Sequence, residues 1–515
     1  MIGQNKNGRV VIPNIYKAIF LLLSAIAQAA VIVLPLVYFR DYLVHVNVIS
    51  ETISLLVVFY IVKSDTNPVY KIPWIVMLML FPVLGWIFYA IYGRAHFSKR
   101  ELSYRMEHLK IKRTALNARP NSNSLVKEKE PNVAVLTEYL YRCADAPVYT
   151  NTTTKYFPLG DDMFPVMLEE LKNAKKFIFM EYFIVEQGEM FDSILEVLEE
   201  KAREGVDVRF VYDSFGSIVK APAHIAKKME KKGIKCIEFN SFKSVFDIRY
   251  NNRDHRKICV IDGSVAFTGG INLADEYINR KTVYGHWKDT AILVKGDAVW
   301  SLTTMFLALW NGISKKGEKD DYMNFVPSNK FTYNDGYVAP FTDYPLDEES
   351  VGRNVYLNII NRASEYVYIM TPYLVPDTLL IGALENAAKS GVDVRIIMPG
   401  IPDKKIVYML SQSYYDVLLK AGVRIYEYTP GFVHAKVFLS DDTTSVVGTI
   451  NLDYRSLAHH MENAVLLYKN SAVDDIKKDF FETMEKCNEV TSGQKKKSVL
   501  RQIFMPILRL FAPLV

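Results

Sequence analysis

The chain has 515 residues, which is more than one hydrophobic core usually contains and predicts two or three folding units. Its formal net charge of +5 is modest for this length and does not point to nucleic acid as a partner. The four cysteines are scattered without a Cys-x-x-Cys pair, which argues against both a disulfide framework and a zinc site.

The first hundred residues carry most of the apolar excess. Ile19 to Phe39 and Ile72 to Tyr92 are 21 residues each and contain no charged residue, so each is long enough to cross a bilayer as a helix. The first run is long for a signal peptide and no small-x-small cleavage site ends it, which favours an uncleaved anchor. Residues 53–62 are apolar but short. We therefore expect two spans and leave a third open.

Basic residues gather after the second apolar run: Arg94, Lys99, Arg100, Arg105, Lys110, Lys112 and Arg113. They place the large C-terminal part in the cytoplasm, and a basic N-terminus on the same side fits two spans better than three. Basic residues beside apolar segments are typical of a protein held at anionic lipid. Residues 1–95 are thus predicted to be a transmembrane anchor, and the polar stretch 96–131, which has no sustained apolar period, a basic linker.

An α/β pattern begins near residue 133 and occurs twice. A buried strand, an amphipathic helix and a second strand follow one another with short links, which predicts parallel strands in an α/β layer. The three segments are 176–185, 190–204 and 206–212 in the first copy, and 366–375, 377–390 and 391–395 in the second.

The strongest repeat is a motif of His, one residue, Lys, four residues and Asp. It runs from His255 through Lys257 to Asp262, and again from His434 through Lys436 to Asp441. On a strand, residues two apart share a face, so each motif sets an imidazole beside a fixed cation. A turn and a short apolar return strand follow each motif.

An asparagine follows each histidine by 17 positions, Asn272 in the first copy and Asn451 in the second. One His-x-Lys would be compatible with a structural histidine beside a solvated lysine, but two copies with the same spacing indicate a function. We expect an internal duplication of two α/β lobes with mostly parallel sheets, residues 132–330 and 331–490. Approximate two-fold symmetry would bring both motifs to one cleft.

The last 25 residues, 491–515, combine three lysines at 495–497 with an apolar segment interrupted by Arg501 and Arg509 and bent at Pro506. This pattern is too short and too charged for a comfortable span. It predicts a basic interfacial tail on an anionic leaflet, with docking onto the catalytic domain as the alternative.

The duplicated motif resembles that of the phospholipase D superfamily, and within it the apolar N-terminus is similar to that of bacterial cardiolipin synthases. The residues that carry the second likeness are Asn67-Pro68, Pro82 to Gly85, Tyr89, Tyr92-Gly93, Gly448 to Ser456 and Arg509 to Leu514. The resemblance implies two phospholipase D-like lobes behind a transmembrane helical region.

The resemblance also implies a mechanism. One histidine, by analogy His255, attacks the phosphorus of a phosphodiester to form a phosphohistidine, and the other, His434, gives a proton to the departing alcohol. Symmetry leaves the reverse assignment open. Lys257, Lys436, Asn272 and Asn451 would surround the non-bridging phosphate oxygens, so neither a metal nor another cofactor is expected.

The family pairs each catalytic histidine with a carboxylate that fixes its tautomer. Asp289 fits this place for His255, and Glu462 fits it for His434; the alternative is that both are ordinary surface carboxylates. Asp262 and Asp441 belong to the catalytic motifs, and we expect them to hold each motif's turn.

The implied activity is transfer of a phosphatidyl group between two phosphatidylglycerol molecules, giving cardiolipin and glycerol, by a multi-pass protein of the cell membrane. The motifs do not identify the acceptor, so a phospholipase D-type hydrolase and another phosphatidyltransferase, including one that uses a nucleotide-activated lipid, remain alternatives. A nuclease would need no anchor. A non-catalytic membrane scaffold is disfavoured because both motifs are intact. The expected partners are phosphatidylglycerol and anionic membrane lipid.

Overall fold

The structure is a computed structural model that describes residues 43–64, 68–93, 99–217, 220–222, 224–240, 253–314, 320–327, 330–345, 349–491 and 499–514. The chain divides into two compact units, residues 1–94 and residues 95–513.

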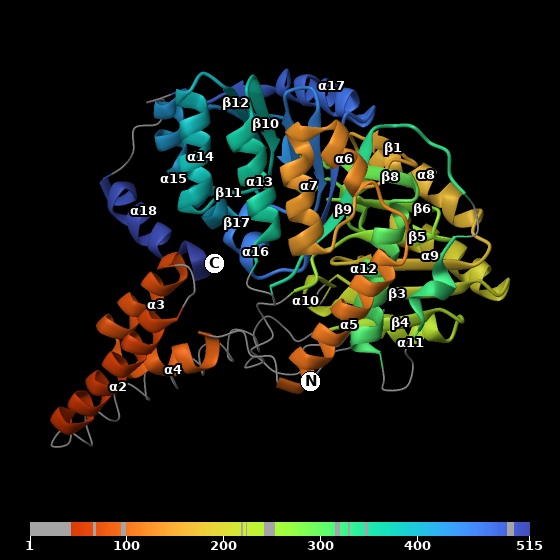
Figure 1. The fold of residues 1–515 in the computed structure, drawn as a ribbon. Coiled ribbons are helices and arrows are strands. Elements are labelled where there is room, and N and C mark those ends of the chain that lie inside the picture. Colours follow the sequence, from red (N-terminus) through yellow and green to blue (C-terminus); the bar gives the residue numbers. More distant parts are fainter. Residues whose placement is uncertain are drawn as a thin grey trace. The chain divides into compact units, whose positions relative to one another are not determined.

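The described part of the first unit contains three helices, α2 (Leu43–Lys63), α3 (Pro68–Leu80) and α4 (Pro82–Tyr92) (Figure 1). The predicted continuous span from Ile72 to Tyr92 is interrupted at Phe81, whose φ of −134° and ψ of 72° are not helical. The interruption follows from Pro82, because proline disfavours the helical conformation of the preceding residue. The doubtful stretch 53–62 lies within α2, and the predicted span Ile19 to Phe39 lies outside the described residues. Within the described ranges, helices that combine the length and the apolar character needed to cross a bilayer are absent.

The polar segment predicted as a linker is helical. It forms α5 (Lys99–Asn117) and α6 (Asn123–Lys129), and α5 packs against α12 (Val299–Ile313). Of the α5 side chains that the structure describes, Leu109, Ala115 and Leu116 enter this core. The linker prediction was wrong because the apolar surface of this contact comes mainly from α12, which is buried along almost its whole length. The segment of α5 therefore shows little apolar periodicity of its own.

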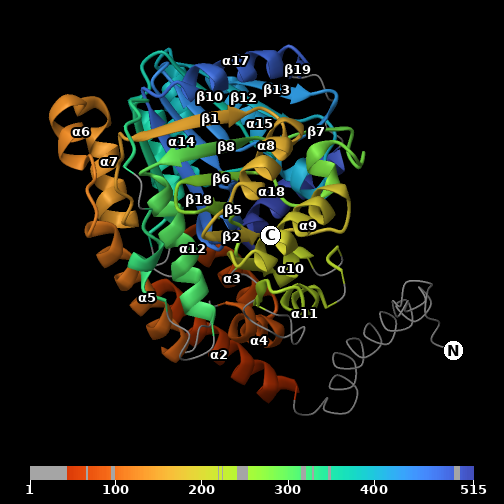
Figure 2. The same cartoon turned by 90° about the vertical axis from the view of Figure 1, so that its right-hand side faces the viewer.

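The first lobe is built on a seven-stranded sheet in the order β1-β8-β6-β5-β2-β3-β4 (Figure 2). The strands are β1 (Thr152–Phe157), β2 (Phe177–Tyr182), β3 (Asp207–Asp213), β4 (Lys235–Phe239), β5 (Ile258–Ile261), β6 (Val265–Gly269) and β8 (Ala291–Gly296). Its helices are α8 (Gly160–Lys172), α9 (Glu189–Arg203), α10 (Ser214–Ser217) and α11 (Ile225–Glu230). The predicted strand, helix and strand near 176–212 are confirmed as β2, α9 and β3, and β2 pairs with β3 in parallel.

The second lobe repeats this order in an eight-stranded sheet, β19-β13-β12-β10-β15-β16-β18-β9, of which Figure 1 labels β12, β10 and β9. The strands are β9 (Tyr337–Asp343), β10 (Tyr366–Met370), β12 (Asp393–Pro399), β13 (Arg424–Tyr428), β15 (Val437–Ser440), β16 (Thr444–Gly448), β18 (Glu462–Tyr468) and β19 (Cys487–Glu489). Its helices are α13 (Val351–Arg362), α14 (Thr378–Lys389), α15 (Lys405–Ala421), α16 (Tyr454–Ala458) and α17 (Ala472–Met484). Asp377 caps α14, because its side chain accepts a hydrogen bond of 3.0 Å from the Leu380 amide.

Both sheets are mixed, and antiparallel pairs outnumber parallel ones, so the prediction of mostly parallel sheets was wrong. In each lobe two adjacent strand pairs are parallel, β2·β3 and β3·β4 in the first and β10·β12 and β12·β13 in the second. The motif strand then folds back as the predicted hairpin, β5 with β6 and β15 with β16, and further antiparallel strands follow. A three-residue turn permits only antiparallel pairing, which explains the pairing within each hairpin.

One hydrophobic core is shared by the two lobes. It joins residues of the first sheet such as Phe179 and Val260 with residues of the second such as Tyr368 and Val437, and α12 contributes most of its length. Separate clusters cover the other faces of the sheets, with α8 and α9 in the first lobe and α13 and α14 in the second. The motif strands are therefore buried on both sides, as their continuous apolar runs indicate.

Helix α7 (Pro131–Ala144) departs from the predicted boundary at residue 132. Its residues Val133, Leu136 and Leu140 pack in the cluster of the second lobe, although the helix precedes the first lobe in the chain. At the other end, α18 (Val499–Phe511) contacts α15. Arg509 Nε donates to Ser413 Oγ at 2.8 Å, and its guanidinium lies 4.4 Å from the ring centre of Tyr414. These contacts favour the docking alternative for α18, and lysines 495–497 lie outside the described residues.

The two motif aspartates hold turns at the distal ends of the motif strands. The Asp262 carboxylate accepts hydrogen bonds of 2.7 to 2.9 Å from the amides of Lys175, Lys176 and Phe177. Asp441 does the same in the second lobe, with the amides of Ser364, Glu365 and Tyr366 at 2.8 to 3.0 Å. Both residues have positive φ angles, 53° and 50°, a conformation that aspartate tolerates better than most residues.

Replacement of Asp262 by alanine should therefore reduce stability. We expect a loss of about 2–3 kcal/mol, because three amides lose a charged acceptor and alanine adopts positive φ at a cost. Thermal unfolding of the purified protein measures this, with Asp441→Ala as the matched variant in the other lobe. Loss of activity without a lower unfolding temperature would instead give these aspartates a chemical role.

Candidate active site

Each His-x-Lys segment lies immediately before its motif strand. His255, Arg256 and Lys257 precede β5, and His434, Ala435 and Lys436 link β14 (Gly431–Val433) to β15. The prediction placed these residues within the strand; the structure places them at its entrance. In both copies the lysine Nζ donates a hydrogen bond to the carbonyl of its own histidine.

The histidines bind their carboxylates in the reverse of the expected pairing. His255 Nδ1 lies 2.9 and 3.0 Å from the two carboxylate oxygens of Glu462, and His434 Nδ1 lies 2.6 Å from Asp289 Oδ2. Each pair therefore joins one lobe to the other. The expected pairs, Asp289 with His255 and Glu462 with His434, were wrong.

Main-chain hydrogen bonds between the lobes explain the exchange. The His255 amide donates to the Met461 carbonyl at 2.9 Å, and the His434 amide donates to the Lys288 carbonyl at 2.7 Å. Met461 and Lys288 are the residues directly before Glu462 and Asp289. Around His434 the contact extends into a parallel ladder of β14 with β7 (His286–Lys288), and around His255 it is a bridge between Asp254 and Met461. The backbone of one lobe thus delivers its carboxylate to the histidine of the other.

Both imidazoles are neutral in this arrangement. Burial lowers the pKa of His255 to about 3 and that of His434 to about 4, against the opposing effect of their carboxylates. Burial alone would raise the pKa of Glu462, but the contact with His255 lowers it overall. With Nδ1–H donating to the carboxylate, the Nε2 lone pair remains as the nucleophilic and basic position of each ring.

The two motif lysines interact electrostatically with the carboxylates of both lobes. Burial lowers the pKa of Lys257 to about 7 and that of Lys436 to about 8. Lys436 lowers the pKa of Lys257 further, while Glu462 and Asp289 oppose the fall. A bound anion would relieve the mutual repulsion of these cations. The site therefore favours a negatively charged group such as a phosphodiester.

The two carboxylates are held differently. Glu462 accepts hydrogen bonds from the hydroxyls of Thr449 and Ser456 in addition to His255. In the first lobe Gly270 occupies the position of Thr449, and a Cβ there would lie 2.0 Å from Asp289 Oδ1. The shorter aspartate side chain is thus matched by a closer backbone, which only glycine permits.

The two predicted asparagines are also unequal. Asn272 Oδ1 accepts from the Ile184 amide at 2.9 Å and its Nδ2 donates to Tyr277 Oη at 2.8 Å, so its amide is engaged in the fold. Asn451 is 5% exposed, and its Oδ1 is buried with no hydrogen-bond partner within the described residues. The phosphate-binding role expected of both asparagines fits Asn451 better than Asn272.

Sequence reasoning did not single out His460. Its ring centre lies 5.5 Å from that of His255, and its Nδ1 lies 3.8 Å from Glu462 Oε1. His255, His460 and Glu462 have ligand atoms within 4.8 Å of one another, a spacing that a divalent cation could use. The Glu462 oxygens, however, already accept from His255, Thr449 and Ser456, so this group fits a hydrogen-bond network better than a metal site. The signal available in the sequence was the adjacency of His460 to Met461 and Glu462.

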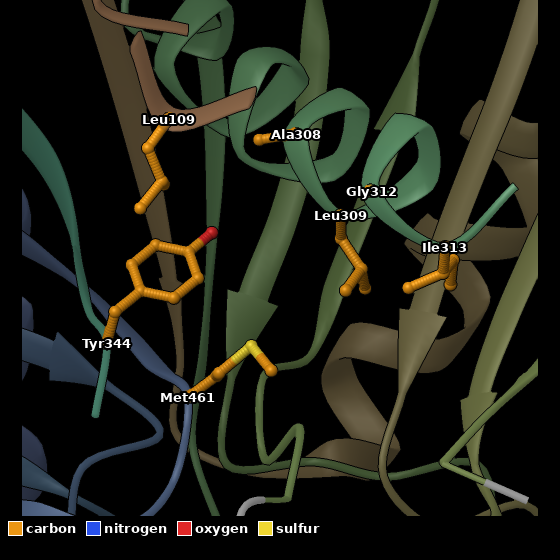
Figure 3. Close-up of a pocket in the computed structure, with 7 residues that line it drawn as sticks. All are labelled: Leu109, Ala308, Leu309, Gly312, Ile313, Tyr344 and Met461. Carbon is orange, nitrogen blue, oxygen red and sulfur yellow. The ribbon is translucent and has the colours of Figure 1, made fainter. Parts of the chain in front are cut away.

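An apolar pocket adjoins Met461, the residue that holds the His255 amide (Figure 3). Figure 3 shows side chains of α5, of the end of α12 and of Tyr344 and Met461 facing a common space. Its lining consists of Leu109, Ala308, Leu309, Gly312, Ile313, Tyr344 and Met461.

The crossed pairs can be tested by double-mutant cycles of thermal stability. We expect His255→Gln and Glu462→Gln to couple by about 1–3 kcal/mol, because each removes the same buried hydrogen bond. His255→Gln and Asp289→Asn should be closer to additive. Stronger coupling between His255 and Asp289 than between His255 and Glu462 would contradict the geometry.

The buried histidines also predict a dependence of stability on pH. Their folded pKa values lie below the value of 6.5 for an unfolded chain, so the unfolded state binds more protons on acidification. The stability they contribute is complete above about pH 6.5 and is lost toward pH 4, by about 1.4 kcal/mol per pH unit and histidine. Unfolding temperatures measured from pH 7 to 4.5 should fall more steeply for the native protein than for His255→Gln/His434→Gln. Parallel curves would show that the rings are not held neutral.

Comparison with known proteins agrees with this site. A family model described as the phospholipase D-like domain of cardiolipin synthase matches residues 167–310 and 356–484, and a model described as the phospholipase D-nuclease N-terminal region matches residues 52–94. A cardiolipin synthase of Halalkalibacterium halodurans is 34% identical over 91% of this chain and 94% of its own. Cardiolipin synthase 1 of Bacillus cereus is 33% identical over 89% and 91%, and an uncharacterised protein of Streptococcus mutans is 45% identical over 89% and 99%.

Among solved structures, phosphatidylserine synthase of Haemophilus influenzae is similar with a TM-score of 0.53. It covers 70% of this chain and 93% of its own at 14% identity, which supports the fold alone. The sequence relatives extend over both lobes and both motifs. The chain therefore belongs to the cardiolipin synthase family of phospholipase D-like proteins.

Proposed function

We propose that the protein is a cardiolipin synthase that transfers a phosphatidyl group from one phosphatidylglycerol to the headgroup of a second. The observation that carries this proposal is the pair of neutral, buried imidazoles, each fixed by a carboxylate of the opposite lobe and each accompanied by a buried lysine bonded to its carbonyl. This set can hold a phosphodiester and supply both a nucleophile and a proton donor. Membership of the cardiolipin synthase family supports it.

The proposed reaction has two displacements. His255 Nε2 attacks the phosphorus, the bond to the headgroup glycerol breaks, and protonated His434 gives its proton to the departing oxygen. A hydroxyl of the second phosphatidylglycerol then gives its proton to His434 and attacks the phosphohistidine, which restores His255 and releases cardiolipin. The anionic substrate supplies the negative charge that permits His434 to be protonated despite its burial.

The surroundings of Glu462 support His255 as the nucleophile. Hydroxyls of Thr449 and Ser456 keep this carboxylate oriented and anionic, which stabilises the positive charge that develops on His255 when it is phosphorylated. Asp289 has no such pair of hydroxyl donors among the described residues. Its partner His434 would act as the acid and base, giving up a proton in the first displacement and taking one back in the second.

Exposed apolar side chains of the first unit support a membrane location for the protein. They include Val48, Ile49, Leu55, Leu56, Phe59, Val62, Met79, Leu80 and Phe81. We infer a cytoplasmic side for the catalytic lobes from the basic residues that follow Tyr92. The lining of the pocket beside Met461 is largely apolar, which suits contact with an acyl chain. A lipid acceptor concentrated at the same membrane surface would compete effectively with water, which favours transfer over hydrolysis.

The proposal predicts that purified protein converts labelled phosphatidylglycerol to cardiolipin and glycerol in mixed micelles containing a chelator. His255→Ala and His434→Ala should each reduce the rate by about 10³-fold or more, because each removes a group that the displacement needs. His224→Asn serves as a control, since asparagine tolerates the positive φ of 56° at that surface position.

Phosphatidic acid as the only product would make the protein a hydrolase. Product that forms only with a nucleotide-activated lipid would make it another phosphatidyltransferase. Full activity in both histidine variants would overturn the proposed mechanism.

A further inference from the structure

Hydrogen-bond acceptors gather at one edge of the second lobe, next to the site. Tyr373 follows β10, Asp403 follows β12 and Asn451 follows β16. Tyr373 and Asp403 thus lie at the carboxyl ends of two adjacent parallel strands, where α/β sheets usually bind their ligands.

Tyr373 and Asp403 form one bonded unit. The Tyr373 hydroxyl donates to Asp403 Oδ2 at 2.6 Å. Lys404 Nζ lies 5.2 Å from the ring centre of Tyr373 and helps to hold the ring. The phenol uses one of about four lone-pair positions of the carboxylate, so Asp403 retains capacity for further donors.

Asn451 departs from the internal repeat at this point. In the first lobe, Asn272 Oδ1 accepts from the Ile184 amide, and the position equivalent to Ile184 in the second lobe is Tyr373. The corresponding bond is absent from the described contacts of Asn451, which leaves its buried Oδ1 without a partner. A buried unpaired acceptor costs free energy unless a ligand or water satisfies it.

These acceptors lie close to Lys436 and to the residues around His434. The short strand β11 (Leu374–Val375) pairs with β17 (Leu452–Asp453), which sets Tyr373 beside Asn451. Burial raises the pKa of Tyr373, as do Asp403, Asp453 and Tyr277, and the ring centre of Tyr277 lies 5.5 Å from that of His434. Burial lowers the pKa of Lys436, and Asp453 and Asp403 are among the carboxylates that oppose this fall.

The chemistry of this edge differs from that of the lysines. Carboxylate and amide oxygens accept hydrogen bonds and repel a phosphate anion, so they suit a ligand that carries several hydroxyl donors. The phosphodiester would lie over Lys257 and Lys436, and the alcohol that leaves or enters would lie beside His434.

We propose that Tyr373, Asp403 and Asn451 form a subsite for the hydroxyl groups of a glycerol headgroup. This inference rests on the proposed function and assigns its acceptor specificity. The subsite binds the leaving glycerol in the first displacement. In the second it holds the glycerol of the acceptor lipid, whose hydroxyl oxygen bonds to phosphorus as the bond from phosphorus to His255 breaks and its proton passes to His434.

The test is the partition of product between cardiolipin and phosphatidic acid in Tyr373→Phe and Asp403→Asn. Both variants should lower the ratio of cardiolipin to phosphatidic acid by about tenfold, because water replaces an acceptor that has lost a hydrogen bond. Tyr408→Phe is the matched control, since it removes a phenol bonded at 2.7 Å to Glu427 elsewhere on the same lobe. An unchanged ratio in both variants, or an equal fall in Tyr408→Phe, would overturn the proposal.

A second measurement stays decisive if a variant fails to fold or if the native protein makes no cardiolipin. Free glycerol and 1-propanol compete as soluble acceptors in the presence of phosphatidylglycerol. The native protein should prefer glycerol by about tenfold, as expected for a site that bonds additional hydroxyls. Equal use of both alcohols would refute the subsite, whereas a glycerol preference without cardiolipin would refute only the proposed function.

Discussion

The structure depends on two buried hydrogen bonds between imidazole and carboxylate that run in opposite directions across the contact of the lobes. His255 is hydrogen-bonded to Glu462 and His434 to Asp289, so neither lobe contains a complete pair of histidine and carboxylate of its own. Main-chain bonds from the two histidine amides to the carbonyls of Met461 and Lys288 fix these positions. A core shared by both sheets keeps the lobes together, and the protein therefore needs both copies of the repeat to make one site.

Duplication supplied the symmetry of this site, and later substitutions removed part of it. Arg256 is fully buried and forms ion pairs with Glu181 and Asp254, at 2.7 and 3.0 Å. The strand registers place Met370, Ala435 and Val433 at the corresponding positions of the second lobe. Apolar residues can replace a buried ion pair of similar volume at little cost in stability, so the two halves were able to diverge. The two lobes differ in the same way at Gly270 and Thr449, which occupy equivalent positions. They also differ at Asn272, whose side-chain oxygen is hydrogen-bonded, and Asn451, whose oxygen has no partner among the described residues.

Much of the fold could be predicted because its signals are local. The period of the apolar residues identified β2, α9 and β3, and the turns after Asp262 and Asp441 identified the hairpins. The helix α5 was missed because few of its described side chains, among them Leu109 and Leu116, pack in the core, while α12 supplies most of the apolar surface. The proportion of parallel pairs was overestimated because the strands after each hairpin carry no signal of their direction.

The main residues of the candidate site were predicted from the sequence, but the pairing of its histidines with its carboxylates was not. Asp289 follows His255 by 34 positions and Glu462 follows His434 by 28, so distance along the chain favoured pairs within one lobe. The exchange is decided by β14 pairing with β7 and by the bridge between Asp254 and Met461, which are contacts between lobes. Likewise, nothing local to Tyr373 or Asp403 indicates that they meet at the edge of the sheet.

The most direct test of the exchanged carboxylates is nitrogen NMR of the full-length protein labelled at its histidine rings, in detergent micelles. We predict that Glu462→Gln shifts the Nδ1 resonance of His255 and leaves that of His434 in place, while Asp289→Asn does the reverse. Resonances would be assigned by replacing each histidine with glutamine. A shift of His255 caused by Asp289→Asn and not by Glu462→Gln would contradict the account.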